Sequence, residues 1–339
     1  MKIQMNFDIK KIILHILDRN LTIPILSDKE HLLNEDIIDF IEKHIIKILN
    51  DSRLRSARFV DDENDVKKLC QSIYDDNENF KRNSSQIATI LFDIMIKYES
   101  IPAADLIFCL FDLDNILYLS ILKFNYRSSY IHHVQIDGNI NVNSIIKQKT
   151  TLPSVNQKIE ECAIINLNNM DIKLLEKKYE LNGESVYYFS NLFLKCTSQI
   201  SSNEKIKLFT KANREFNNKY FKEDYLKYGE VNKAVADSIE KTESIDIERI
   251  ANNAFKQNSE LKEEYIKQIG DIGIKEKTIP VSEKVAKKKF IKQKIKTNTG
   301  IEIDLPAQYY GDNSKIEFIN NTDGTISILI KNITELSNV

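Results

Sequence analysis

Two runs of apolar and β-branched residues open the chain and predict strands of a small sheet. Residues Ile9–Leu17 (IKKIILHIL) favour a strand, and residues 18–20 (DRN) can turn the chain. Residues Leu21–Leu26 resume an extended pattern. Pro24 within this second run indicates an edge position, because proline has no amide hydrogen to donate to a neighbouring strand.

Apolar residues at helical spacing follow, and they predict helices that cover this sheet. Asn34 is a suitable N-cap, and residues 37–49 place their isoleucines on one helical face. A second amphipathic pattern, Ser85–Tyr98, predicts another helix.

From Asp105 onward the pattern becomes that of strands. Two apolar runs flank the turn residues 112–115 and predict a buried hairpin, and a later strand ends at the turn dipeptide of residues 137–138. The predicted strands are Leu106–Phe111, Ile116–Phe124, Tyr130–Ile136 and Cys162–Leu167.

The last 140 residues combine helical and strand patterns. A capping-box sequence at Ser201 introduces apolar residues at helical spacing as far as Tyr220, and further helices are expected up to Ile272. Beyond residue 300 the pattern alternates, and residues 320–324 (NNTDG) predict a hairpin turn between Lys315–Ile319 and Thr325–Ile330.

Length and composition fit these elements into several domains. The 339 residues exceed the usual size of a single hydrophobic core, and the few glycines and prolines argue against a loop-rich all-β protein. We therefore predict an α+β fold with three parts: an N-terminal mixed sheet with packed helices (1–200), a central helical module (201–275), and a lysine-rich segment with a small C-terminal sheet (276–339).

The lengths of the apolar runs and the spacing of the cysteines indicate the cellular compartment of the protein. No run approaches the ~20 residues that cross a bilayer, and the first residues do not form a signal peptide, so we expect a cytoplasmic protein with no membrane contact. The four cysteines lie far apart without a CxxC pair, which favours buried thiols over a zinc site or disulfides.

Positive charge is concentrated in one segment. Between Glu283 and Lys296 seven lysines face one acid, although the whole chain carries a formal net charge of −2. Clustered ammonium groups release counterions from nucleic-acid phosphates, so this segment predicts a DNA-binding surface; a solvated linker is the competing interpretation. The lysines are Lys284, Lys287, Lys288, Lys289, Lys292, Lys294 and Lys296. If residues 291–296 form a strand, the last three share one face.

Two smaller groups of cations are further candidates. Lys123 and Arg127 lie among the aromatic residues Phe124, Tyr126 and Tyr130, where they could hold phosphates or belong to a core. The arginines at positions 53, 55 and 58 follow the first long helix, where they could serve its C-terminal dipole or a phosphate.

The order of these elements resembles that of the bacterial nucleoid-associated protein family of the NdpA/YejK type. The segments that carry the resemblance are Lys11–Leu17, Leu106–Arg127, Ile164–Leu175, Gly300–Ala307 and Lys315–Lys331. The resemblance implies an α+β N-terminal domain and a DNA-binding, dimeric protein of the nucleoid, and it supplies no catalytic residues. The long strands of residues 106–124 could pair across a two-fold axis. The lysine segment is denser than the family pattern, so its role rests on charge alone.

Enzymatic alternatives have little support in the sequence. Phosphate-binding glycine loops, GxSxG and HExxH are absent, and the adjacent histidines 132 and 133 point to opposite faces of a strand. A metal-dependent nuclease could use the triplet Glu176-Lys177-Lys178 with Asp171 upstream. We therefore expect a non-enzymatic protein without catalytic residues, metal or cofactor, which binds double-stranded DNA through phosphates with weak sequence specificity.

A different class of function also fits the chain. The central helical module could bind a protein partner, which would make the chain an interaction or DNA-sensing subunit of a bacterial genome-defence or mobile-element system.

Overall fold

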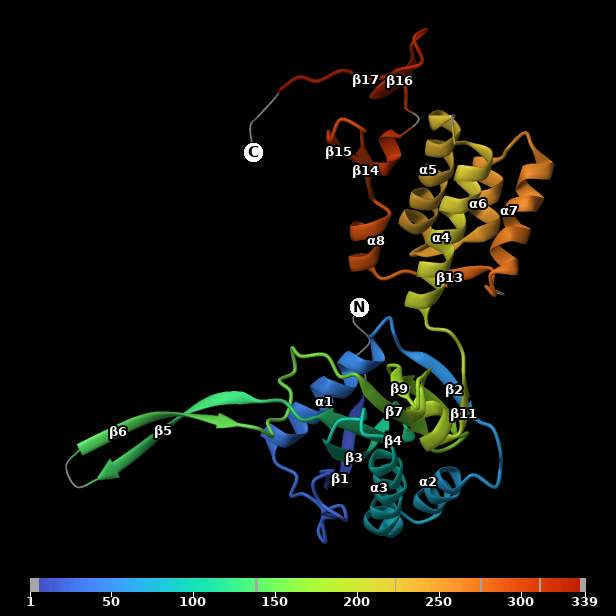
Figure 1. The fold of residues 1–339 in the computed structure, drawn as a ribbon. Helices are drawn as coiled ribbons and strands as arrows, with labels where there is room; N and C mark the ends of the chain where they lie inside the picture. Colours follow the sequence, from blue (N-terminus) through green and yellow to red (C-terminus); the bar gives the residue numbers. More distant parts are fainter. Residues whose placement is uncertain (1–5, 138–139, 223, 275, 311, 336–339) are drawn as a thin grey trace. The chain divides into compact units, whose positions relative to one another are not determined.

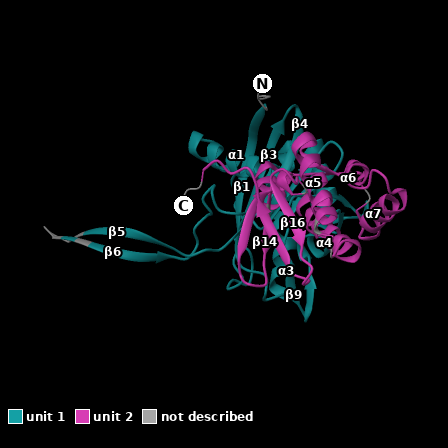
Figure 2. Cartoon of the chain, turned by 90° about the horizontal axis from the view of Figure 1, so that it is seen from above, with its two compact units in different colours: residues 1–201 teal, residues 202–339 magenta. Residues whose placement is uncertain are grey.

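The computed structural model describes residues 6–137, 140–222, 224–274, 276–310 and 312–335. The chain divides into two compact units, residues 1–201 (unit 1) and 202–339 (unit 2), which are coloured separately in Figure 2. The finer division into three domains stays a prediction.

A seven-stranded sheet forms the centre of unit 1 (Figure 1). Its strands, in spatial order, are β1 (Phe7–Leu17), β3 (Ala104–Leu113), β4 (Ile116–Asn125), β7 (Glu161–Asn166), β8 (Asp171–Leu175), β2 (Arg55–Phe59) and β11 (Cys196–Ser198). Each neighbouring pair is antiparallel, where the sequence had suggested a mixed sheet.

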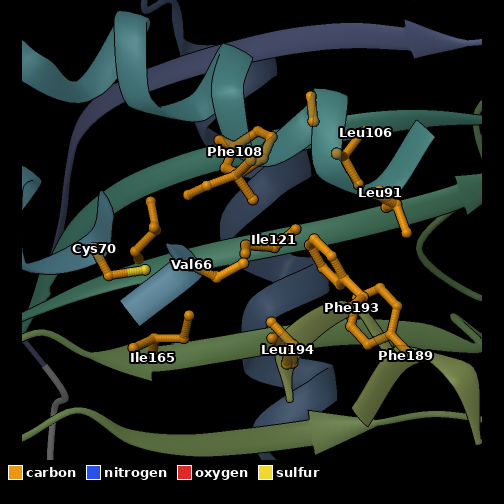
Figure 3. Close-up of a cluster of buried hydrophobic side chains, with 14 of the residues drawn as sticks. Val66, Cys70, Leu91, Leu106, Phe108, Ile121, Ile165, Phe189, Phe193 and Leu194 are labelled. Carbon is orange, nitrogen blue, oxygen red and sulfur yellow. The ribbon is translucent and has the colours of Figure 1, made fainter. Parts of the chain in front are cut away.

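Helices cover both faces of this sheet, which explains the continuous apolar runs of β3 and β4. Successive residues of β3 alternate between two cores: Leu106 and Phe108 enter the core shared with α2 and α3, whereas Ile107 and Cys109 enter the core shared with α1. Figure 3 shows the first of these cores. The helices of unit 1 are α1 (Glu35–Leu49), α2 (Asp65–Asp75), α3 (Phe80–Lys97), the short 3-10 turn η1 (Asn77–Asn79) and the π-helix η2 (Phe189–Leu194).

The helix starts follow the expected capping chemistry. The side chain of Asn34 accepts a hydrogen bond from the Ile37 amide (2.9 Å), and Asn64 does the same for Lys67 (3.0 Å) at the start of α2. Glu35 and Asp36 add negative charge to the first turn of α1.

Two hairpins, one short and one long, complete unit 1. One pairs β9 (Tyr179–Leu181) with β10 (Glu184–Val186), and the other pairs β5 (Ser129–Asp137) with β6 (Ile140–Gln148). The β5–β6 hairpin leads away from the sheet and its helices (Figures 1 and 2).

Unit 2 begins with a group of helices around one core. They are α4 (Ser202–Tyr220), α5 (Tyr225–Thr242), α6 (Ile247–Ala254), α7 (Ser259–Asp271) and α8 (Glu283–Lys289). A single buried cluster runs from Ile206 on α4 to Phe290 just after α8, so the start of the lysine-rich segment packs against the helices.

Short antiparallel pairs make up the rest of unit 2. They are β12 (Ser244–Asp246) with β13 (Thr278–Pro280), β14 (Lys292–Lys296) with β15 (Glu302–Pro306), and β16 (Ile316–Asn320) with β17 (Ile326–Ile330). The short 3-10 turn η3 (Ala307–Tyr309) follows β15.

The α+β class is confirmed, and two expectations about strands were wrong. Residues 21–26 form only an isolated bridge, between Ile25 and Ile16, instead of a full strand. The strands of residues 106–124 are flanked by β1 and β7, so neither has a free edge that could pair across a two-fold axis. The turn predicted at residues 137–138 includes Gly138, which lies outside the described residues.

All four cysteines, Cys70, Cys109, Cys162 and Cys196, are buried free thiols within unit 1. Desolvation raises the pKa of the Cys70, Cys162 and Cys196 thiols to about 12. Desolvation also raises the pKa of the Cys109 thiol well above its usual value.

Candidate nucleic-acid interface

The seven lysines of the lysine-rich segment fall on two adjoining elements of unit 2. Lys284, Lys287, Lys288 and Lys289 belong to α8, while Lys292, Lys294 and Lys296 alternate along β14. Residues 292–296 are indeed a strand, so the last three lysines share one face of the hairpin. All seven side chains are exposed.

Neighbouring acids neutralise some of these lysines. Lys294 and Lys296 both contact Glu302 on β15, with nitrogen–oxygen distances of 2.6 and 3.4 Å, and Lys287 pairs with Glu283 one turn away on α8. Among the residues that the structure describes, Lys284, Lys288, Lys289 and Lys292 form no ion pair. The strongest uncompensated charge therefore lies at the junction of α8 and β14.

A groove of about 350 Å³ lies at this junction, and helices α4 and α5 supply its other wall. Its cationic lining consists of Lys288, Lys289, Lys292, Lys294 and Arg214. No Asp or Glu occurs among the described residues that line it. The groove therefore presents five cations to a polyanion, and in the described structure four of them, Lys288, Lys289, Lys292 and Arg214, form no ion pair, whereas Lys294 contacts Glu302.

Arg214 is the residue that the sequence analysis missed. It is an isolated arginine on α4, far from the lysines along the chain, and its side chain is exposed. It lies close enough to Tyr228 on α5 to oppose the rise in the pKa of that phenol, which desolvation causes. The only sequence signal for Arg214 was its place on the polar side of an amphipathic helix.

Polar residues at the base of the groove are bonded to one another. The Asn213 and Asn217 amides donate to the Asn232 side chain at 3.3 and 3.4 Å, and the Tyr265 hydroxyl donates to Asn213 at 2.8 Å. These bonds fix α4 against α5 and α7, so the groove has a rigid floor.

Local packing holds the lysine-bearing elements in place. Ala286 and Phe290 are buried in the helical core and anchor α8. After β15 the ring of Tyr310 lies against Gly229 on α5, where a Cβ atom would approach the ring carbon Cδ1 to 1.7 Å. A glycine is required there, because any side chain would push the C-terminal part of the unit away from α5.

Lys123, one of the second predicted group of cations, is not on the surface. Lys123 is 1% exposed, and its ammonium pairs with Glu161 on β7 at 2.9 Å. Asn125 and Tyr179 donate to the same carboxylate oxygen at 3.2 and 3.0 Å. Desolvation lowers the pKa of Lys123, although the Glu161 charge opposes that shift. Lys123 therefore belongs to the core of unit 1.

Arg127 is half-buried and also has a structural partner. Its guanidinium donates to the backbone carbonyl of Lys158 at 3.1 Å. Lys123 and Arg127 belong to unit 1, whereas the lysine-rich segment belongs to unit 2.

The three arginines after α1 are used in ion pairs. Arg53 pairs with Asp51 at 2.7 Å, Arg55 with the buried Glu176 at 3.2 Å, and Arg58 with Asp171 at 2.8 Å. Arg55 also stacks on the Tyr187 ring, with its guanidinium carbon 4.2 Å from the ring centre. The contacts of Arg55 and Arg58 join β2 to β8 and the residues that follow it, whereas the Arg53–Asp51 pair is local to the turn before β2.

The proposed nuclease residues do not form a site. Asp171 begins strand β8 and Glu176 follows its end, so at ~3.3 Å per residue they lie roughly 16 Å apart. Glu176 is bonded to Arg55 and to the Ser190 amide. Lys177 pairs with Glu160 at 2.6 Å, and the Lys178 ammonium lies over the Tyr187 ring, 5.1 Å from its centre. The described residues contain no cluster of three or more His, Cys, Asp or Glu side chains that could bind a metal ion.

A larger groove on the other side of α5 differs in charge. Its lining includes the cations Lys227, Lys233, Lys241 and Lys256, but also the acids Glu230 and Asp237. Mixed charge makes it less attractive to a polyanion than the acid-free groove.

Within the described part of the chain, no helix combines the length and apolar character that spanning a membrane requires.

An α+β chain with a rigid, acid-free groove of five cations has the features of a candidate nucleic-acid-binding protein. Comparison with protein families is consistent with this class. The model of the family described as nucleoid-associated protein YejK matches residues 13–337, and the chain belongs to that family. A search of curated proteins found no match.

Proposed function

We propose that this member of the nucleoid-associated family binds double-stranded DNA through the groove of Arg214, Lys288, Lys289, Lys292 and Lys294. The single observation that carries the proposal is the convergence of these five cations on one concave surface without a described acid in its lining. Such a surface gains affinity by releasing counterions from phosphates.

Recognition is phosphate-led and weakly sequence-specific. Lysines act as point charges and carry little base information. The asparagines that could read base edges, Asn213 and Asn232, bond to each other at 3.3 Å in the floor of the groove. The protein works without catalysis or a cofactor, as a homodimer on DNA in the nucleoid.

A salt titration with matched variants tests this proposal. Binding of the full chain to a mixed-sequence duplex is measured by fluorescence anisotropy from about 50 to 300 mM salt. Changing Lys288, Lys289, Lys292 and Lys294 to Gln should weaken binding at low salt by more than ~100-fold and flatten the log–log salt slope by about 3 to 4.

The larger groove of unit 2 supplies the control. Changing Lys227, Lys233, Lys241 and Lys256 to Gln removes the same formal charge from the same unit. This variant should keep most of the native salt slope. Equal losses in both variants would mean diffuse electrostatic attraction, and no native binding at low salt would refute the proposal.

A protein partner is the second candidate function, and the mixed-charge groove between α5 and α6 favours it. Grooves with both signs of charge suit a peptide or helix better than a polyanion. Loss of a stoichiometric co-purifying protein in the Lys227, Lys233, Lys241 and Lys256 variant, with DNA binding intact, would support this function.

A further inference from the structure

The β5–β6 hairpin, residues 129–148, is an arm that unit 1 does not cover. Each of its side chains that the structure describes is exposed. The arm extends away from the sheet in two perpendicular views (Figures 1 and 2). An isolated two-stranded hairpin is at best marginally stable in water, so this arm needs a partner surface.

Apolar side chains occupy both faces of the arm. Tyr130, Val134 and Ile145 share one face, with exposed fractions of 69, 55 and 80%. Ile131 and Ile146 are cross-strand partners on the opposite face. Either face of the arm therefore offers apolar side chains to a partner.

Unit 1 carries a second exposed apolar surface, which we name the 21–33 surface. It lies in the segment between β1 and α1 and includes Ile23 and Leu32, which are 71 and 84% exposed. Its large apolar side chains are Leu21, Ile23, Ile25, Leu32 and Leu33.

The two surfaces carry opposite charge. Residues 127–149 contain three bases, Arg127, Lys147 and Lys149, and one acid. Residues 21–39, which comprise the 21–33 surface and the first residues of α1, contain five acids and one lysine. Within the described structure, the exposed acids Asp28, Glu35 and Asp36 form no ion pair, so they are available to a basic partner.

We propose that the arm of one copy docks on the 21–33 surface of a second copy, and that the second copy returns the same contact. The arm leads away from the sheet and helices of unit 1, so the 21–33 surface of its own unit does not receive it. Two reciprocal contacts give a closed two-fold dimer. The two nine-residue strands of the arm, with the surface that receives them, approach the roughly 20–30 residues a side of a stable interface.

The charge distribution favours this partner over DNA. The cations lie at the base of the arm, at Arg127, Lys147 and Lys149, and residues 129–146 contain no lysine or arginine. A ribbon that enters a DNA groove needs its cations at the tip. The inference deepens the homodimer named under the proposed function and is independent of the DNA groove in unit 2.

Sedimentation velocity of the full chain tests the apolar part of the interface. The native chain should be a dimer at micromolar concentration. Changing Val134 and Ile145 to Asn should weaken the dimer roughly 100-fold or more, because two apolar side chains lose their burial. Changing Leu329 and Ile330 to Asn is the matched control, since these residues are comparably exposed on another two-stranded hairpin, β16–β17.

Charge reversal tests the pairing of the two surfaces. Lys147→Glu with Lys149→Glu reverses the arm, and Glu35→Lys with Asp36→Lys reverses the receiving surface. Each variant alone should dimerise at least tenfold more weakly. A mixture of the two should form a heterodimer, because both reciprocal contacts then join opposite charges.

The outcomes separate this interface from the DNA proposal. A monomeric native chain, or a dimer that only the Leu329 and Ile330 variant breaks, would overturn the interface and leave the DNA groove untouched. An arm variant that stays dimeric and loses DNA affinity would also overturn it and make the arm a DNA contact. Unchanged circular dichroism of the arm variants would confirm that the fold is intact.

Discussion

Unit 1 and unit 2 use positive charge in opposite ways. In unit 1, Lys123 and Arg55 are buried and paired with Glu161 and Glu176, so their charges contribute to the core. In unit 2, Lys288, Lys289 and Lys292 are exposed beside Arg214, so their charges can bind an anionic ligand. The comparison shows that the surroundings of a lysine, more than the local density of cations, decide its role.

The largest expected effect comes from breaking the buried pair of unit 1. Lys123→Met leaves Glu161 buried without its countercharge and should cost about 3–5 kcal/mol of unfolding free energy, measured with urea. The folded fraction should bind DNA as the native chain does. Adding Glu161→Met should restore much of the stability, because an apolar pair needs no solvation. A stable single variant with weakened DNA binding would contradict the buried role.

A smaller effect on unit 1 should follow the protonation of His15, which is fully buried. Its Nε2 and Nδ1 atoms contact the Ser84 hydroxyl and the Ser27 amide, both at 3.1 Å. Because the Ser27 amide donates to Nδ1, the ring is neutral, and desolvation lowers the pKa of His15 to about 4.

The sign of the pH effect follows from that shift. The unfolded chain takes up the proton near pH 6.5, so stability should fall as the pH drops from about 6.5 to about 4, by at most roughly 3 kcal/mol. His15→Gln should flatten this part of the profile in urea titrations at several pH values. His31→Gln, at an exposed position, is the control, and a flattening of the same size in that variant would contradict the assignment.

In unit 2, a single cation of the groove should have a moderate effect on binding alone. Arg214→Gln should weaken DNA binding about three- to tenfold at low salt and reduce the salt slope by about one, with unchanged thermal stability. Lys287→Gln removes a lysine that already pairs with Glu283, so it should change affinity less. A larger loss of DNA affinity for Lys287→Gln than for Arg214→Gln would mean that the DNA binds outside the groove.

The smallest expected effect is a gain of binding. Glu302→Gln removes the acid that contacts Lys294 and Lys296 and should strengthen DNA binding about two- to threefold at low salt. The gain should disappear at high salt, because exposed charges are then screened. Anisotropy titrations at two salt concentrations measure both, and Glu317→Gln, in the more distal β16–β17 hairpin, is the control.

Sequence patterns predicted the elements that bury regular apolar faces. Continuous apolar runs predicted the strands β3 and β4, which are buried on both faces. Apolar residues at helical spacing predicted the helices α1, α4 and α5, which are buried on one face. Strand β2 and helix α2 escaped because their sequences are short and mostly polar, and their contacts come from distant residues such as Asp171 and Leu194.

The candidate site, too, could be predicted from the sequence only in part. A dense lysine run is visible in any sequence, but the partner of Lys123 lies on another strand, and Arg214 reaches the groove from another helix. Only the tertiary fold assigns Lys123 to a core and adds Arg214 to the groove.

The placement of the cysteines gives the chain a built-in reporter. All four thiols are buried in unit 1, their pKa values are raised, and unit 2 contains none. A maleimide or disulfide reagent can react only when unit 1 opens, so the labelling rate measures the rate of that opening. Opening of unit 2 produces no labelling, because unit 2 has no cysteine. A cysteine introduced on the arm would be labelled at once in an otherwise unreactive protein.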